Sequence, residues 1–283
     1  AYGEYVLLER LGSGGMSDVD LAKKAIDESG FERFVVIKRV KADRVADESF
    51  IRMFKDEARI TSQLNHTNIA QTYDFGRVGD EYFLVLEYVP GIDIRGIINT
   101  LRERDQRVPL RVVLYIIHEV LEGLEYAHEM VDMRGNSMNI VHRDVNPRNI
   151  MVSIRGDVKL IDFGVAKATD RLERTRTDHV KGKFRYMSPE QITGKTIDHR
   201  ADLFAVGLTF HELLNGYSPY VGLTQIQIMH KLVSGEVPNL PPVSELRDAS
   251  ELERIHHKAL HPELDHRYRD AAEFRADIVA MAD

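Results

Sequence analysis

The sequence predicts an α+β fold with two lobes: a small lobe built on an antiparallel sheet with one main helix, and a larger helical lobe. Two observations carry this prediction. Up to about Val89 the chain consists mainly of short apolar runs separated by Gly-containing turns, which is typical of antiparallel strands. Beyond Pro90-Gly91, long segments carry apolar residues at helical spacing. Two lobes imply a cleft.

The strands are expected in the first part of the chain. Residues 5–40 alternate apolar and polar side chains around a Gly-rich turn. Two further strand-like runs cover residues 69–75 and 82–89, and the sequence Val78-Gly79-Asp80 between them predicts a hairpin turn. These segments together predict the small sheet.

The helices are predicted from the period of the apolar residues. Residues 47–64 form one amphipathic helix with Asp47 as its cap, and residues 110–130 form a longer one. Residues 203–214 are apolar nearly all round and stop at Gly216, which predicts a helix buried in the middle of the second lobe.

Composition excludes several classes of protein. The 283 residues carry a net charge of -7 and a pI of about 6.0, so nothing points to a nucleic-acid partner. The absence of cysteine excludes disulfides and Cys-built zinc sites. No apolar run is long enough to span a membrane, and Glu4, Glu9 and Arg10 interrupt any signal peptide. We expect a cytoplasmic segment without membrane contact, although the full-length protein could be anchored elsewhere.

The first motifs suggest a phosphate site. Residues 11–19 read LGSGGMSDV, and glycines between two strands let backbone N–H groups approach a polyphosphate. By itself, such a loop is more often an ordinary turn between strands. Lys38 lies on the apolar strand VVIKRV, residues 35–40, and Glu57 lies on the polar side of the predicted helix, where it can pair with Lys38.

The next motifs suggest a cation site. VHRDVNPRNIMV begins at Val141 and KLIDFGVAK begins at Lys159. They contain Asp144, Asn149 and Asp162, whose oxygens suit a hard Mg²⁺ ion that also binds phosphate. A capping role at a turn could explain either Asp alone, but not both at this distance after a Gly-rich loop and a strand lysine.

With YMSPEQ at residues 186–191, these motifs in this order resemble the eukaryotic-like protein kinase catalytic domain. The resemblance runs from about Tyr5 to Ile278, and GGMSDV and YMSPEQ are similar to bacterial Ser/Thr kinases. It implies a two-lobed protein-kinase-like fold in a single catalytic domain. The expected bounds are 1–283 for the domain, about 1–89 for the N-lobe, about 87–92 for the hinge and about 93–283 for the C-lobe.

The resemblance also implies an ATP site. Its expected residues are Leu11, Gly12, Ser13, Gly14, Gly15, Met16, Ser17, Val19, Val36, Lys38, Leu86, Glu87, Val89, Asp93 and Met151. Among them, Leu86 would be the gatekeeper, Asp93 would bond the ribose, and Met151 would cover the adenine from below. Lys38 would hold the α- and β-phosphates with Glu57 orienting it.

The same resemblance assigns the remaining roles. Asp144 would accept the proton of the substrate hydroxyl and orient it, while Asn149 and Asp162 would bind Mg²⁺, with Mn²⁺ as the alternative ion. The scaffold residues it implies are an ion pair between Glu190 and Arg267 and a brace from Asp202 to the HRD backbone.

Regulation is expected on the loop from about Val165 to Lys183, at Thr175, Thr177 and Thr169. Arg143 beside the catalytic Asp would carry a positive charge that a phosphate could balance. Ordinary solvent-exposed threonines are the alternative. Phosphorylation of one copy by another would require self-association.

Two positions depart from the family pattern. Ser/Thr kinases usually carry Lys at the position of Asn146 and Thr at the position of Lys183. We hypothesise a swap in which Lys183 supplies the missing charge at the γ-phosphate. Arg148 offers a second route, because tyrosine kinases place Arg at this offset, and the third alternative is slow turnover. Arg148 favours a tyrosine acceptor, whereas Pro147 and the SPEQ and Gly-loop context favour Ser/Thr, which we prefer.

The predicted function is ATP-dependent phosphorylation of Ser/Thr hydroxyls in protein substrates. The alternative is a pseudokinase that acts as a nucleotide-binding scaffold, but Lys38, Glu57, Asp144, Asn149 and Asp162 are all present. A small-molecule phosphotransferase is disfavoured by the extended segment 165–190 and the SPE–Arg267 pairing. His256, His257 and His261 are expected on a helix surface and not at a metal.

Overall fold

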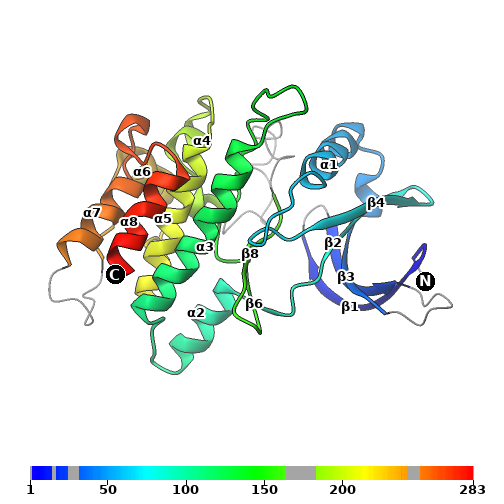
Figure 1. Ribbon diagram of the computed structural model, residues 1–283, viewed down its shortest axis with the longest axis horizontal. Coiled ribbons are helices and arrows are strands. Elements are labelled where there is room, and N and C mark those ends of the chain that lie inside the picture. Colours follow the sequence, from blue (N-terminus) through cyan, green and yellow to red (C-terminus); the bar gives the residue numbers. More distant parts are fainter. Residues whose placement is uncertain are drawn as a thin grey trace. The chain divides into compact units, whose positions relative to one another are not determined.

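The computed structural model describes residues 2–14, 17–24, 32–163, 183–236, 238–240 and 249–282, with only the backbone for Asp43 and Lys183. Two compact units emerge, one reaching to Pro90 and the other beginning at Gly91. The first holds a five-stranded sheet and α1, and the second holds α2 to α8 (Figure 1).

The sheet of the first unit is antiparallel, with strand order β1-β2-β3-β5-β4. Its strands are β1 (Tyr5–Ser13), β2 (Ser17–Lys24), β3 (Phe34–Val40), β4 (Thr72–Val78) and β5 (Glu81–Glu87). The predicted hairpin turn joins β4 to β5, with Gly79 at φ +59°. β4 begins later than the predicted Ile69, because the N–H of Ile69 bonds the carbonyl of His66 in a turn.

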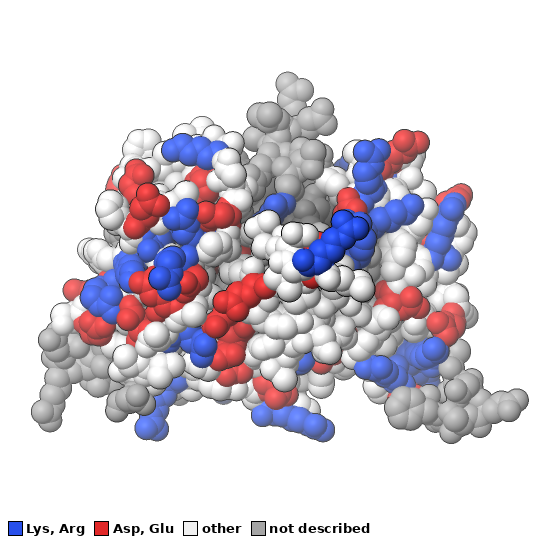
Figure 2. All heavy atoms as spheres, turned by 45° about the horizontal axis from the view of Figure 1, so that its top comes forward, with Lys and Arg blue, Asp and Glu red and all other residues white. Residues whose placement is uncertain are grey.

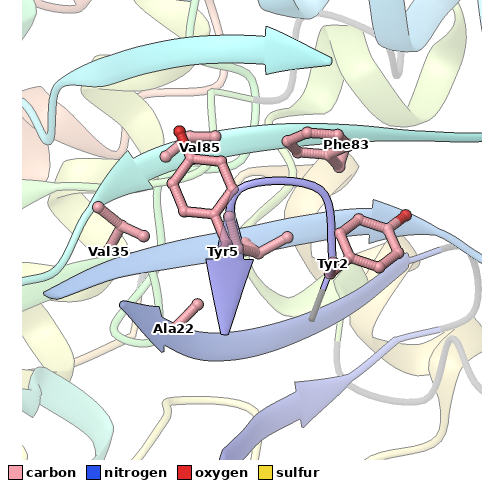
Figure 3. Packing of buried hydrophobic residues seen from close by; sticks show 7 residues of the cluster. Tyr2, Tyr5, Ala22, Val35, Phe83 and Val85 are labelled. Carbon is pink, nitrogen blue, oxygen red and sulfur yellow. The ribbon is translucent and has the colours of Figure 1, made fainter. Parts of the chain in front are cut away.

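The two faces of this sheet are covered differently. On one face, Tyr2 and Tyr5 from the start of the chain pack over Val35, Phe83 and Val85 (Figure 3). The aromatic rings of Tyr2 and Phe83 meet edge to face, with centroids 5.3 Å apart. The N-terminal residues therefore close this side of the sheet.

The other face carries α1 (Glu48–Thr61), preceded by the short 3₁₀ helix η1 (Ala42–Arg44). Phe50 and Phe54 of α1 pack with Val40 and Leu84 of the sheet. Asp47 caps the helix as predicted, because its side chain accepts a hydrogen bond from the N–H of Phe50 at 3.1 Å.

The second unit is mainly helical. Its helices are α2 (Ile94–Glu103), α3 (Leu110–Glu129), α4 (Pro189–Thr193), α5 (Arg200–Asn215), α6 (Gln225–Ser234), α7 (Ser250–Ala259) and α8 (Ala271–Ala282), with 3₁₀ turns η5 (Lys183–Tyr186) and η6 (Leu264–His266). A small antiparallel sheet contains β6 (Gly91–Asp93), β7 (Ile150–Ser153) and β8 (Val158–Leu160). Within the described ranges, no helix is both long and apolar enough to cross a membrane.

α5 is the predicted central helix. Apart from Arg200, every residue of α5 is buried, and Gly216 ends it in the left-handed conformation at φ +79°. Gly207 allows α7 to approach closely, since a Cβ atom at this position would lie 2.9 Å from the Cβ of Ala259. On the face shown in Figure 2, Lys and Arg side chains are interspersed with Asp and Glu side chains.

Candidate active site

The predicted pair of Lys38 and Glu57 is formed in the first unit. The Nζ atom of Lys38 lies 2.8 Å from Oε1 of Glu57. β3 supplies the lysine and α1 the glutamate, and both side chains are largely buried, with 13% and 11% exposed. The charge-assisted hydrogen bond within this partly desolvated pair fixes the position of the lysine ammonium.

Several side chains predicted to contact the adenine share the sheet face of Lys38. Val19 is paired with Lys38 across β2 and β3, and Val36 is paired with Leu86 across β3 and β5. Val19, Val36 and Leu86 are half-buried, whereas Val35 and Ile37 on the opposite face of β3 are buried. Half-buried apolar side chains beside an ammonium group suit a nucleotide base and its phosphates.

The glycine-rich loop joins β1 to β2. The N–H of Gly14 bonds the carbonyl of Ser17 at 2.9 Å, and a Cβ atom at Gly12 would meet nothing within 4 Å. Leu11 lies in a bulge of β1 with 48% of its surface exposed. The predicted Gly15 and Met16 lie outside the described residues.

The segment predicted as the hinge begins with Glu87, at the end of β5. The N–H of Glu87 bonds the carbonyl of Gln71 at 2.8 Å, and its Oε2 accepts the N–H of Gln71 at 3.0 Å. Val89 is buried, with 6% exposed. The backbone at the end of β5 is thus held by main-chain and side-chain bonds to one residue.

In the second unit, Asp93 and Met151 are direct partners across β6 and β7. Oδ1 of Asp93 accepts the N–H of Gly96 at 2.6 Å and so caps α2. The strands approach closely because Gly91 has no side chain: a Cβ atom there would lie 2.0 Å from the carbonyl oxygen of Val152. The predicted ribose and adenine contacts of this unit therefore lie side by side.

The loop of residues 142–149 is held by its own side chains. Nδ2 of Asn149 donates to the carbonyl of Asp144 at 2.8 Å and to its carboxylate at 3.1 Å. Nδ2 of Asn146 donates to the same carbonyl at 2.8 Å, while its Oδ1 accepts the N–H of Arg148 at 3.0 Å. Asn146 therefore braces the loop, and the Arg148 side chain is exposed.

The two predicted cation ligands lie at one end of a hairpin. Ile150 of β7 pairs with Leu160 of β8, and the N–H of Ile161 then bonds the carbonyl of Asn149 at 2.9 Å. This register places Asn149 beside the residue preceding Asp162, whose backbone takes the left-handed φ of +56°. An amide oxygen and a carboxylate fit Mg²⁺, which prefers hard oxygen ligands.

Asp202 braces the HRD segment as predicted. Its carboxylate accepts the N–H groups of His142 at 2.8 Å and Arg143 at 2.7 Å, and it lies 2.9 Å from Nε2 of His128. Burial alone would raise the pKa of Asp202, but the hydrogen bond and charge of His128 help bring that pKa below its ordinary value. The brace holds Arg143 at the strained φ of +65°.

The predicted ion pair of Glu190 and Arg267 is also present. It is bidentate, with N–O distances of 2.8 and 2.9 Å, and both side chains are almost completely buried. Next to it, Nε2 of Gln191 donates to the carbonyl of Arg143 at 3.2 Å. The SPEQ segment is therefore attached to the residue before Asp144.

Residues 5–272 match the family described as the protein kinase domain. The chain belongs to the protein kinase family. This match, together with the structural likeness below, confirms the predicted fold. The family uses ATP and a divalent cation to phosphorylate proteins.

Bacterial relatives resemble this kinase, as predicted. It is 40% identical to "Tyrosine-protein kinase MasK" of Myxococcus xanthus over 96% of this chain and 42% of that protein. It is 36% identical to "Serine/threonine-protein kinase PknB" of Mycolicibacterium smegmatis over 98% of this chain and 43% of that protein. The crystal structure of the Mycobacterium tuberculosis PknI kinase domain has a TM-score of 0.71 and 26% identity, covering 100% of this chain and 97% of that one. The kinase spans less than half of the two curated relatives.

Some predicted residues of the kinase are not reached by the structure. The side chain of Lys183 and the threonines Thr169, Thr175 and Thr177 lie outside the described residues. Their roles stay predictions.

The structure of the kinase also contains a buried cluster that the sequence motifs did not indicate. Glu212 of α5 has no exposed side-chain surface and bonds both Arg95 of α2 and the hydroxyl of Tyr186. Burial, followed by the charge of Glu212, raises the pKa of Tyr186. The sequence did contain a hint of this cluster. Glu212 lies in the nearly apolar stretch 203–214, and a buried carboxylate requires a partner.

Two predictions about the kinase histidines are wrong, because His261 lies beyond the end of α7 at Ala259 and His256 does not face solvent. His256 was expected on a helix surface, but it is fully buried and its Nε2 lies 3.0 Å from Nδ1 of His211. It shares the inward side of α7 with Leu252, Ile255 and Ala259. The face packed on α5 therefore includes a histidine, while the neighbouring His257 is exposed as expected.

Proposed function

We propose that residues 1–283 form a single catalytic domain that transfers the γ-phosphoryl group of ATP to Ser or Thr hydroxyls of proteins. The observation that carries this proposal is the formed ion pair of Lys38 and Glu57, at 2.8 Å. Protein kinases need this pair for activity, so it favours a working enzyme over a pseudokinase scaffold.

The residues of the second unit have distinct roles in this reaction. Asp144 accepts the hydrogen bond of the substrate hydroxyl and orients its oxygen toward the phosphorus, while Asn149 keeps that carboxylate in place. Asn149 and Asp162 would hold Mg²⁺, with Mn²⁺ as the alternative, and the ion when bound would neutralise charge on the phosphate oxygens. Lys38 neutralises further phosphate charge from the first unit.

The acceptor type rests on mixed features, and Ser/Thr is the stronger reading. Pro147, the Gly-rich loop and the SPEQ segment follow the Ser/Thr pattern, and the PknB relative is named a Ser/Thr kinase. Tyrosine is the second candidate, because Arg148 stands where tyrosine kinases carry an Arg and the MasK relative is named a tyrosine kinase.

Regulation would use a second copy of the chain. Thr175 and Thr177, with Thr169 as a further site, would be phosphorylated in trans, and Arg143 would bind the added phosphate. Burial lowers the pKa of the Arg143 guanidinium, so a nearby phosphate would favour its charged form. The domain would act in the cytoplasm, where ATP is available.

The test is the intact mass of the protein after phosphatase treatment, followed by incubation with ATP and Mg²⁺. We expect stepwise gains of one phosphate each in the wild type and none in Asp144→Asn. Peptide mapping should place phosphate on Thr175 or Thr177. Peptides that differ only in carrying Ser, Thr or Tyr as the acceptor residue identify the acceptor type. A wild type that binds ATP but never gains mass or labels a peptide would support the pseudokinase instead.

A further inference from the structure

Four charged side chains form a continuous ladder across the strands that flank the glycine-rich loop. The members of this ionic ladder are Arg10 of β1, Asp18 and Asp20 of β2, and Arg39 of β3. The guanidinium of Arg10 lies 2.9 Å from Asp18 and 2.5 Å from Asp20. Arg39 lies 2.9 Å from Asp20 and 4.0 Å from Asp18. Each aspartate thus contacts both arginines.

The two carboxylates differ in burial and in additional partners. Asp20 retains only 6% of its side-chain exposure, so it depends on both guanidinium groups for compensation. Asp18 retains 18% and also accepts the hydroxyl of Ser13 at 2.8 Å. Ser13 is the last residue of β1, so this bond ties the two strands where they enter the loop.

The ionic ladder lies on the sheet face opposite to Lys38. Side chains alternate along β2, so Asp18 and Asp20 point away from Val19, which is the partner of Lys38. They point instead to the face of Ala22, part of the packed cluster drawn in Figure 3. A ligand on the Lys38 face is therefore not touched by the ladder, whose effect must pass through the backbone.

We propose that the ionic ladder fixes the two strand ends, at Ser13 and Asp18, between which the glycine-rich loop binds the phosphates of ATP, which rests on the function proposed above. Immediately beyond Ser13 and Asp18, the N–H of Gly14 closes the loop on the carbonyl of Ser17 at 2.9 Å. A strand pair held at this point lowers the entropic cost of closing the loop on a phosphate group. The four ladder members are positioning residues for ATP.

Calorimetric binding of Mg²⁺·ATP and of adenosine tests the ladder. In Asp18→Asn and in Arg10→Gln, we expect the Kd for ATP to rise about five- to tenfold, while the Kd for adenosine, which has no phosphates, stays within about twofold. In steady state, the KM for ATP should rise by a similar factor while kcat is unchanged. General destabilisation of the first unit would instead weaken the binding of both ligands.

Two matched control variants test whether ATP binding depends on the carboxylate of Asp18 and on the location of the ladder beside the loop. Asp18→Glu retains the carboxylate and should keep ATP binding near the wild-type value. Glu4→Gln removes the pair with Lys24, 3.0 Å apart, at the far end of the same two strands and should leave the Kd for ATP unchanged. Similar losses in Glu4→Gln would contradict a local role for the ladder.

Three outcomes would overturn the proposal: folded Asp18→Asn and Arg10→Gln with unchanged ATP binding, equal weakening of ATP and adenosine, or a wild type that binds no ATP. The last would also refute the proposed function. A wild type that binds ATP in a ladder-dependent way but never transfers phosphate would refute phosphoryl transfer alone and support the ladder.

Discussion

At the scale of single residues, the catalytic loop shows what replaces the usual lysine. Asn146 uses both ends of its amide within the loop, bonding the carbonyl of Asp144 and the N–H of Arg148. Both bonds lie within the loop, so Asn146 orders it, and because the amide is neutral it supplies no charge to a phosphate. The positive charge at the γ-phosphate must then come from another residue or be missing.

Single substitutions can identify the residue that supplies that charge. We expect Lys183→Ala to lower kcat about a hundredfold, since one charged contact to the transition state is worth roughly this much. Lys183→Arg should retain most of the rate, and Arg148→Ala should have a smaller effect. Steady-state kinetics with a fixed peptide measure all three. The reverse order would assign the charge to Arg148, and full activity in both alanine variants would refute both assignments.

Much of the site was predictable at this scale because its residues belong to motifs with fixed chemistry. The pairs Lys38–Glu57 and Glu190–Arg267 and the brace by Asp202 are all formed. The cluster of Glu212, Arg95 and Tyr186 lies outside these motifs and was not predicted from the sequence. The partners of Glu212 depend on which segments pack on α5. A single sequence does not specify that packing.

At the scale of elements, the three helices predicted with bounds are all present. α1 and α5 follow from apolar spacing, capping and a terminal glycine, which are local signals. The start of β4 was missed because a turn at Ile69 depends on a single backbone bond. The inward position of His256 was missed because a polar residue was assumed to face solvent, whereas its partner lies on α5.

The crossing of α5 and α7 gives a prediction of stability. Gly207→Ala adds a methyl group that would lie 2.9 Å from side-chain carbons of Ala259 and Leu260, which is closer than van der Waals contact. We expect a loss of about 1–3 kcal/mol in the free energy of unfolding, typical of overpacked cores. Urea unfolding measures it.

A double variant provides the control for this crossing. Ala259→Gly in the Gly207→Ala background should recover part of the loss, seen as coupling in a double-mutant cycle. If Gly207→Ala instead gains about 1 kcal/mol, as expected from helix propensity alone, then α5 and α7 do not pack as described.

At the scale of the whole molecule, the histidine pair between α5 and α7 predicts how stability depends on pH. Burial lowers the pKa of His211 to about 4 and that of His256 to about 3. Between pH 6.5 and about 4 the unfolded chain therefore binds more protons than the folded one, and stability falls as the pH falls. Above pH 6.5 the full contribution is present.

Thermal or urea unfolding between pH 6.5 and 5.5 measures this contribution, since few carboxylates titrate there. Each buried histidine should lower the free energy of unfolding by about 1 kcal/mol as the pH falls from 6.5 to 5.5. The variant His211→Gln/His256→Gln should show a flatter pH profile, whereas His230→Gln, at an exposed position, should keep the wild-type slope. Equal slopes in all three proteins would contradict neutral burial of the pair.

Every contact described for Asp144 and Asn149 comes from the second unit, whereas Lys38 and Glu57 belong to the first. In the proposed function, the residues that orient the substrate hydroxyl and the ion pair required for activity therefore belong to different units. In the proposed function, a signal that displaced α1 would break the ion pair of Lys38 and Glu57, while the loop of Asp144 would keep its bonds. Inhibition of this kind would be readily reversible, because the hydrogen bonds of the Asp144 loop would not have to form again when the signal ends.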